Sequence, residues 1–141
     1  MASLVSTIIS RTERVSTALL VDTDASSQES LCKLLDECQI RTIVVTNSLA
    51  AMEVLRSEPI EILICEDLGG LYGVEVLEVC AALFPSIRRV YLARKASAEL
   101  HCEAVIRGHV HATVTESMHP VDLRNVIASL LRPHSGPQST R

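Results

Sequence analysis

Five short apolar runs recur along the chain, and longer segments with apolar residues at helical spacing separate them. The runs lie at residues 18–21, 43–45, 60–64, 89–93 and 111–115. They are mostly continuous runs rather than strictly alternating ones, which is typical of strands covered on both faces. We therefore predict five buried strands.

The segments between these runs predict five helices. Leu31, Leu34, Leu35 and Cys38 fall at positions i, i+3, i+4 and i+7, which places them on one face of the first helix. Ser26 with Glu29 fits a capping box at its start. The third helix is expected from Val74 to about residue 84. Proline and glycine mark further helix boundaries, at Pro85, Gly108, Pro120 and Pro133.

Strands that alternate with helices predict an α/β fold with a doubly wound, five-stranded parallel sheet. We expect the flavodoxin-like strand order 2-1-3-4-5. Residues 17–132 would form this domain, residues 1–16 an N-terminal extension, and residues 133–141 a flexible tail or linker stub.

A cluster of polar residues follows the first and third strands, whose carboxyl ends are neighbours in this strand order. It consists of Asp22, Asp24, Cys65, Glu66 and Asp67. Open α/β sheets bind ligands at this place, so we predict that these residues share one crevice. No tightly bound cofactor is predicted, but carboxylates are the ligands that Mg²⁺ prefers, and weak binding of this ion stays open.

Composition narrows the classes of partner. The formal net charge is -4 and no long basic run occurs, which argues against direct contact with nucleic acid. No apolar run is long enough to cross a membrane. The five cysteines are an odd number without a CxxC pair, as expected of reduced thiols in the cytoplasm.

Three stretches carry a resemblance to a known family: Leu19 to Asp24, Pro59 to Leu77, and Val114 to Leu123. They resemble parts of the receiver domains of response regulators. In order, these parts are the first strand with its acidic cluster, the phosphoacceptor strand with its loop and the start of the next helix, and the fifth strand with its proline-containing turn. The resemblance covers most of the chain. It implies a signalling domain of two-component type, not an enzyme, with a protein partner such as a histidine kinase or another regulator.

The residues that perform phosphoryl transfer in this family are replaced at several positions. In the family, two acids after the first strand and an acceptor Asp hold Mg²⁺ during the transfer. Asp22 matches the first acid, but Thr23 stands in place of the second. The acceptor position falls on Cys65 by its distance from Gly73, or on Glu66 if the loop is one residue shorter. Neither residue is the Asp of the family.

The remaining positions of the family pattern differ as well. Ala93 stands where a Thr or Ser hydroxyl would bind the phosphoryl group, and Glu116 where a Lys would pair with its charge. Thr113 falls near the place of the switch aromatic. The acids at this place, Asp22, Glu66, Asp67 and Glu116, would repel a phosphoryl anion unless Arg94 or Lys95 compensates for their charge.

The resemblance and its departures together predict an atypical, or pseudo-receiver, domain that binds a protein partner without phosphorylation. A homodimer through the last strand and its flanking helices is compatible with this interpretation. Three alternatives stay open. The domain could accept a phosphoryl group on Asp67 or Asp24, it could be the regulatory N-terminal domain of a longer transcription activator, or Cys65 could be a thiol sensor.

Other side chains have simpler interpretations than a reactive site. Cys65 is expected to be a packed thiol at a strand end, because nearby acids would raise its pKa. We interpret four histidines as solvated loop residues rather than metal ligands: His101, His109, His111 and His119. Arg88 and Arg89 are expected to be solvated at the start of a strand. A partner could contact Tyr91, Val105, Ile106 and Val110, although each could equally belong to the core.

Overall fold

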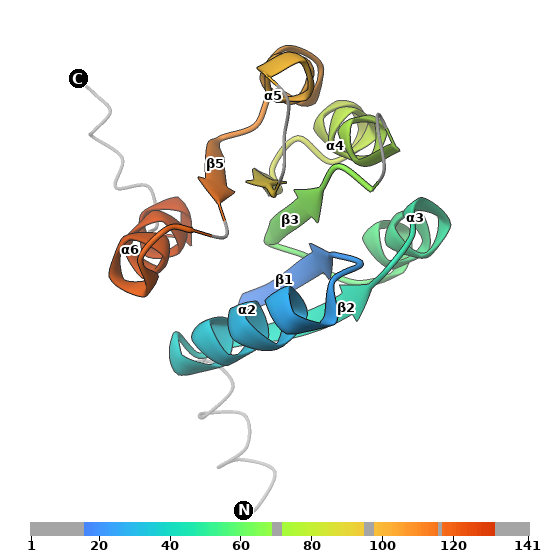
Figure 1. The fold of residues 1–141 in the computed structure, drawn as a ribbon. Coiled ribbons are helices and arrows are strands. Elements are labelled where there is room, and N and C mark those ends of the chain that lie inside the picture. The colour runs from blue at the N-terminus through green and yellow to red at the C-terminus, as the bar shows by residue number, and fades with distance from the viewer. Residues whose placement is uncertain (1–15, 69–71, 95–97, 116, 132–141) are drawn as a thin grey trace, which may run out of the picture.

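The protein forms one five-stranded parallel sheet with helices on both faces (Figure 1). The computed structural model describes residues 16–68, 72–94, 98–115 and 117–131. The strands are β1 (Ser16–Val21), β2 (Ile40–Val45), β3 (Ile62–Glu66), β4 (Arg88–Ala93) and β5 (Ala112–Thr115). The helices are α2 (Ala25–Glu37), α3 (Ser48–Ser57), α4 (Tyr72–Leu83), α5 (Ala98–Gly108) and α6 (Pro120–Leu131). The strand order β2-β1-β3-β4-β5 confirms the predicted fold class.

Each face of the sheet has its own apolar layer. Leu19, Val21, Leu63 and Tyr91 belong to the layer under α3, α4 and α5. Ala18, Leu20, Ile64 and Leu92 belong to the opposite layer under α2 and α6. Successive strand residues therefore alternate between the two layers, and both layers are apolar because helices cover both faces.

The interior contains few aromatic side chains, as the composition indicates. Tyr91 is the largest fully buried side chain and lies in β4. It therefore belongs to the core and cannot be part of a docking surface. Val105 and Ile106 on α5 are 46% and 69% exposed, so they remain available to a partner.

Two expectations about local structure are wrong. The N-cap of α2 is Asp24, whose carboxylate accepts a hydrogen bond from the Ser27 amide at 2.8 Å, so the helix begins before the predicted Ser26–Glu29 capping box. The helix after β3 begins at Tyr72 rather than at Val74.

Arg89 is buried, not solvated, with 6% of its surface exposed. Its guanidinium group donates hydrogen bonds to the carbonyl oxygens of Ile87 at 2.8 Å, Gly108 at 3.1 Å and His109 at 3.1 Å. Carbonyl oxygens at the end of a helix carry partial negative charge, so they stabilise this cation away from water. Arg89 thereby fixes the connection between α5 and β5 to the start of β4.

Residues 1–15 and 132–141 lie outside the described residues, as do Lys95 and Glu116. These ranges contain nearly all of the predicted extension, residues 1–16, and the whole of the predicted tail, residues 133–141. In the part of the chain that the structure describes, no helix is both long enough and apolar enough to span a membrane.

Candidate functional site

Three charged side chains meet at the carboxyl ends of β1, β3 and β4. Asp22 follows Leu20 by two positions, Glu66 follows Ile64 by two, and Arg94 follows Leu92 by two. Because strand side chains alternate between faces, all three continue the apolar layer under α2 and α6 beyond its edge. The three strands are neighbours in the sheet, with β3 in the middle. The fold therefore brings the three side chains to one place.

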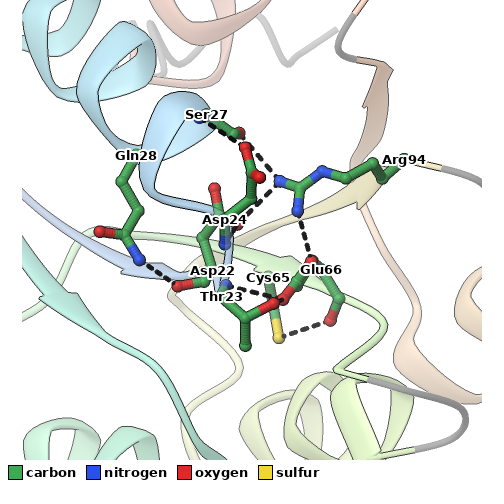
Figure 2. Close-up of polar contacts among 8 residues, drawn as sticks. All are labelled: Asp22, Thr23, Asp24, Ser27, Gln28, Cys65, Glu66 and Arg94. Carbon is green, nitrogen blue, oxygen red and sulfur yellow. Dashed lines mark hydrogen bonds and ion pairs between the residues drawn. The ribbon is translucent and has the colours of Figure 1, made fainter.

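Arg94 bridges the two carboxylates (Figure 2). Its Nη2 atom lies 2.7 Å from Asp22 Oδ1, and its Nη1 atom lies 2.7 Å from Glu66 Oε1. Nη2 also donates a hydrogen bond to Ser27 Oγ at 2.8 Å. Such short, charge-assisted contacts in a fixed fork are the strong class of hydrogen bond. Arg94 thus connects the end of β4 to β3, to β1 and to the first turn of α2.

The remaining oxygen of Glu66 is also bound. Glu66 Oε2 accepts hydrogen bonds from the Thr23 amide at 2.7 Å and from the Thr23 hydroxyl group. Both oxygens of this carboxylate therefore have donors: a guanidinium group on one side and the β1–α2 connection on the other.

Asp22 is satisfied at only one of its two oxygens. Asp22 Oδ1 accepts a hydrogen bond from the Asp24 amide at 3.0 Å in addition to its contact with Arg94. Asp22 Oδ2 is buried and has no hydrogen-bond partner among the described residues. The Asp22 residue is completely buried, so this oxygen is an uncompensated acceptor inside the site.

The bridge lies largely out of water. The side chains of Asp22, Glu66 and Arg94 are 0%, 5% and 14% exposed. Burial alone would lower the pKa of Arg94, but the hydrogen bond and charge of Asp22, with the charges of Glu66 and Asp24, outweigh it and raise the pKa. The guanidinium group is therefore positively charged at neutral pH.

Two residues of α2 also support the site, and the sequence pattern did not identify them. Ser27 contacts Arg94, and the Gln28 side-chain amide donates a hydrogen bond to the Asp22 main-chain carbonyl. Both lie in the first turn of α2, which Asp24 caps. Proximity to a predicted N-cap after an acidic strand end is the signal that could have found them.

Cys65 points away from the charged cluster. It is completely buried, and its Sγ atom lies 3.3 Å from the Glu66 carbonyl oxygen and 3.7 Å from the Gly73 carbonyl oxygen. Burial raises the pKa of this thiol well above its usual value, and the charges of Glu66, Asp67 and Asp22 raise it further. This geometry matches the packed thiol expected from the sequence.

Gly73 allows the β3–α4 turn to close on the end of β3. Its amide donates a hydrogen bond to the Asp67 carbonyl oxygen at 2.9 Å. A Cβ atom at this position would lie 1.8 Å from the Glu66 carbonyl oxygen and 2.8 Å from Asp67 Cα. Only glycine therefore fits against the backbone that carries Glu66 and Asp67.

Ala93, another predicted site position, directly precedes Arg94 in the chain. Ala93 ends β4 and pairs in register with Thr115, the last residue of β5. Ala93 has no hydroxyl group, and Glu116 lies outside the described residues. The four histidines considered for a metal site do not form one: within the described ranges, no three His, Cys, Asp or Glu side chains are arranged to hold a metal ion.

The residues in the crevice do not fit the magnesium ion that the family resemblance implies. Mg²⁺ requires several oxygen ligands with open lone pairs in an octahedral arrangement. Three of the four oxygens of Asp22 and Glu66 already accept hydrogen bonds from the protein, and a cationic side chain lies between the two carboxylates. Asp22 Oδ2 is the one that remains.

A groove of about 640 Å³ adjoins the site between α2 and α6. Asp24 and Ser27 form its end next to the bridge, and Leu31, Leu34 and Leu123 are among its apolar lining. Arg124 and Glu37 pair across it at 2.9 Å. The charged cluster is therefore next to a surface groove with an apolar floor.

Solved structures with a similar fold include receiver domains and response regulators. The signal receiver domain of an HD domain-containing protein from Pseudomonas fluorescens has a TM-score of 0.78 at 20% identity, with 84% of this chain and 95% of that chain covered. A response regulator from Thermotoga maritima has a TM-score of 0.74 at 16% identity, with 82% and 97% covered. The chain has the receiver-domain fold.

One curated relative is similar in sequence. It is the hydrogenase transcriptional regulatory protein HoxA of Cupriavidus necator, which is 31% identical over 81 residues. The match covers 57% of this chain and 17% of HoxA, so the chain spans only a small part of that relative's length. No family model matches the sequence.

Proposed function

We propose that this chain is an atypical receiver domain that binds a protein partner without being phosphorylated. The observation that carries the proposal is the Arg94 bridge between Asp22 and Glu66, at 2.7 Å on each side. A receiver pocket that transfers phosphoryl groups needs a carboxylate oxygen that can attack and space for the incoming group. Here both Glu66 oxygens are already bound by protein donors.

In this proposal Glu66 takes the place of the acceptor and acts as a fixed negative charge. Glu66 lies on the site face of β3, whereas Cys65 belongs to the opposite layer and is buried. Arg94 supplies the positive charge that the sequence lacks at the end of β5. The pocket would then hold one arrangement, and partner binding would not need a switch between two states.

The partner would be another protein of a signalling or regulatory system, such as a histidine kinase or a second regulator. The groove between α2 and α6, and the exposed Val105 and Ile106 on α5, are the surfaces we assign to such contacts. The similarity to HoxA supports a regulatory domain within a longer transcription regulator. Five free cysteines agree with the cytoplasm as its compartment.

An active phosphoacceptor is the competing function, and Asp67 and Asp24 are its candidates. Asp24 is engaged as the N-cap of α2 through the Ser27 amide. Asp67 follows β3 directly, and its carbonyl oxygen accepts the Gly73 amide in the β3–α4 turn. Of the two candidates, Asp67 is the one that lies at the carboxyl end of β3, where the resemblance places the acceptor.

Intact-mass measurement after incubation with a small acyl phosphate donor and Mg²⁺ tests the proposal. We expect no mass increase in the protein, while a receiver domain with an acceptor Asp, treated in parallel, gains one phosphoryl group. A gain of one phosphoryl group by the wild-type chain would overturn the proposal, and the Asp67→Asn variant would then identify the acceptor.

A further inference from the structure

Arg94 holds the position that a metal cation would need in order to bridge Asp22 and Glu66. Its two terminal nitrogens contact one oxygen from each carboxylate at 2.7 Å (Figure 2). A third contact, to Ser27 Oγ at 2.8 Å, fixes the guanidinium group against α2. The carboxylates are thus held by a cation that belongs to the chain itself.

The unpartnered oxygen of Asp22 indicates that this arrangement is incomplete as a hydrogen-bonded network. Asp22 is fully buried, and its Oδ2 atom has no donor within the ranges that the structure describes. A buried carboxylate oxygen without a donor is unfavourable, and a metal ion could satisfy both oxygens of the group together. The site therefore retains ligand capacity that the guanidinium group does not use.

We infer that Arg94 is the resident counter-ion of this pocket and excludes divalent metal ions from it. Two effects combine. The guanidinium group occupies the lone pairs of Asp22 Oδ1 and Glu66 Oε1, and its charge repels a second cation in a site with little water to screen it. Without Arg94, oxygens of both buried carboxylates would be open to a hard cation.

The inference rests on the proposed function, because both assign the pocket a fixed charge instead of a metal-dependent phosphoryl cycle. It goes further in naming the residue that sets the metal affinity of the pocket. The two can fail separately: phosphorylation of the wild-type chain would overturn the proposed function, whereas the inference depends on metal binding alone.

Titration with Mn²⁺, followed by the electron paramagnetic resonance signal of the free ion, tests the inference. We compare the wild-type protein with Arg94→Gln, which removes the charge but keeps an amide donor. Arg107→Gln is the matched control, because Arg107 pairs with Glu78 at 2.8 Å on the surface, away from the site. We expect the Arg94→Gln variant to bind Mn²⁺ on the order of tenfold or more tightly than the other two proteins.

Two further variants keep the test decisive. Asp22→Asn combined with Arg94→Gln is expected to lose the added Mn²⁺ affinity, which would locate the ion at Asp22. Arg94→Lys keeps the positive charge and is expected to exclude Mn²⁺ as the wild-type protein does. If Arg94→Gln is unfolded without metal, we expect Mn²⁺ to refold it, as circular dichroism would detect.

The inference is overturned if Arg94→Gln, folded, binds Mn²⁺ no more tightly than the wild-type protein. It is also overturned if an unfolded Arg94→Gln variant fails to refold with Mn²⁺, or if the wild-type protein already binds the ion as tightly as the variant.

Discussion

Arg94 and Asp22 are 72 positions apart in the sequence, yet Arg94 Nη2 lies 2.7 Å from Asp22 Oδ1 across the carboxyl edge of the sheet. The side chain of Arg94 crosses over β3 to reach β1, and it binds Glu66 of β3 on the way. The bridge therefore joins the ends of three neighbouring strands. Its partners are buried, so the ion pairs are weakly screened by solvent.

Cysteine reactivity distinguishes a packed Cys65 from a thiol sensor. Cys65 is completely buried with a raised pKa, burial raises the pKa of Cys80 to about 11, and Cys102 is exposed. Since the thiolate is the reactive form, we expect a thiol reagent to label Cys102 first and Cys65 only on unfolding. Peptide mass spectrometry over a time course measures the order. Faster labelling of Cys65 than of Cys102 in the native protein would support the sensor.

The stability of the protein should decrease in acid partly through His111. Burial lowers the pKa of His111, and the positive charges of Arg89 and Arg88 lower it further. Its Nδ1 atom also accepts a hydrogen bond from the Arg89 amide at 2.8 Å, which requires an unprotonated nitrogen. With a pKa below the unfolded value of about 6.5, the folded state binds fewer protons than the unfolded state in acid. The stability from His111 is therefore complete above that pH and decreases as the pH falls through it.

Urea unfolding of the wild-type protein and of His111→Gln at pH 7.5 and pH 5.5 measures this effect. We expect the wild-type protein to lose more unfolding free energy between the two pH values than the variant does. Carboxylates titrate in both proteins, so their contribution cancels in the comparison. Equal losses in the two proteins would exclude His111 as the source.

Gly73→Ala should disrupt the backbone beneath the charged site. The new Cβ atom would lie 1.8 Å from the Glu66 carbonyl oxygen, and the backbone of β3 cannot move without shifting Glu66. We expect a loss of roughly 3 kcal/mol in the free energy of unfolding, the upper range for overpacking. Gly108→Ala is the comparison, because its Cβ would lie 2.8 Å from Leu77 Cβ, a less severe overlap than 1.8 Å from a main-chain oxygen. A smaller loss for Gly73→Ala than for Gly108→Ala would contradict the role of Gly73.

The fold could be predicted from the sequence because apolar runs and helical stripes repeat in a regular order. The strand order and Pro120 at the start of α6 agree with the prediction. The burial of Arg89 could not be predicted, because it depends on the carbonyl oxygens of Gly108 and His109, which only the folded chain brings to Arg89. Local sequence contains no sign of such non-local partners.

The site could be predicted only in part. Asp22, Glu66 and Arg94 each continue a two-residue alternation from a buried strand residue, and this pattern could have placed them on one face. The sequence left open whether Arg94 or Lys95 compensates for the acids. It also left open whether Cys65 or Glu66 faces the site, because the length of the following loop fits both. Alternation assigns residues to faces within one strand, but the match between the faces of neighbouring strands depends on their register and packing, which the sequence pattern does not specify.

The coupling energy between Arg94 and Glu66 tests the central claim most directly. A double-mutant cycle compares the unfolding free energies of the wild-type protein, Arg94→Met, Glu66→Gln and the double variant. We predict a coupling energy of about 1.5 kcal/mol or more, since removing one partner of a buried ion pair leaves the other charge uncompensated. The exposed pair of Arg124 and Glu37, treated in the same way, should give less than about 1 kcal/mol. A coupling energy between Arg94 and Glu66 no larger than that of the exposed pair would contradict the account.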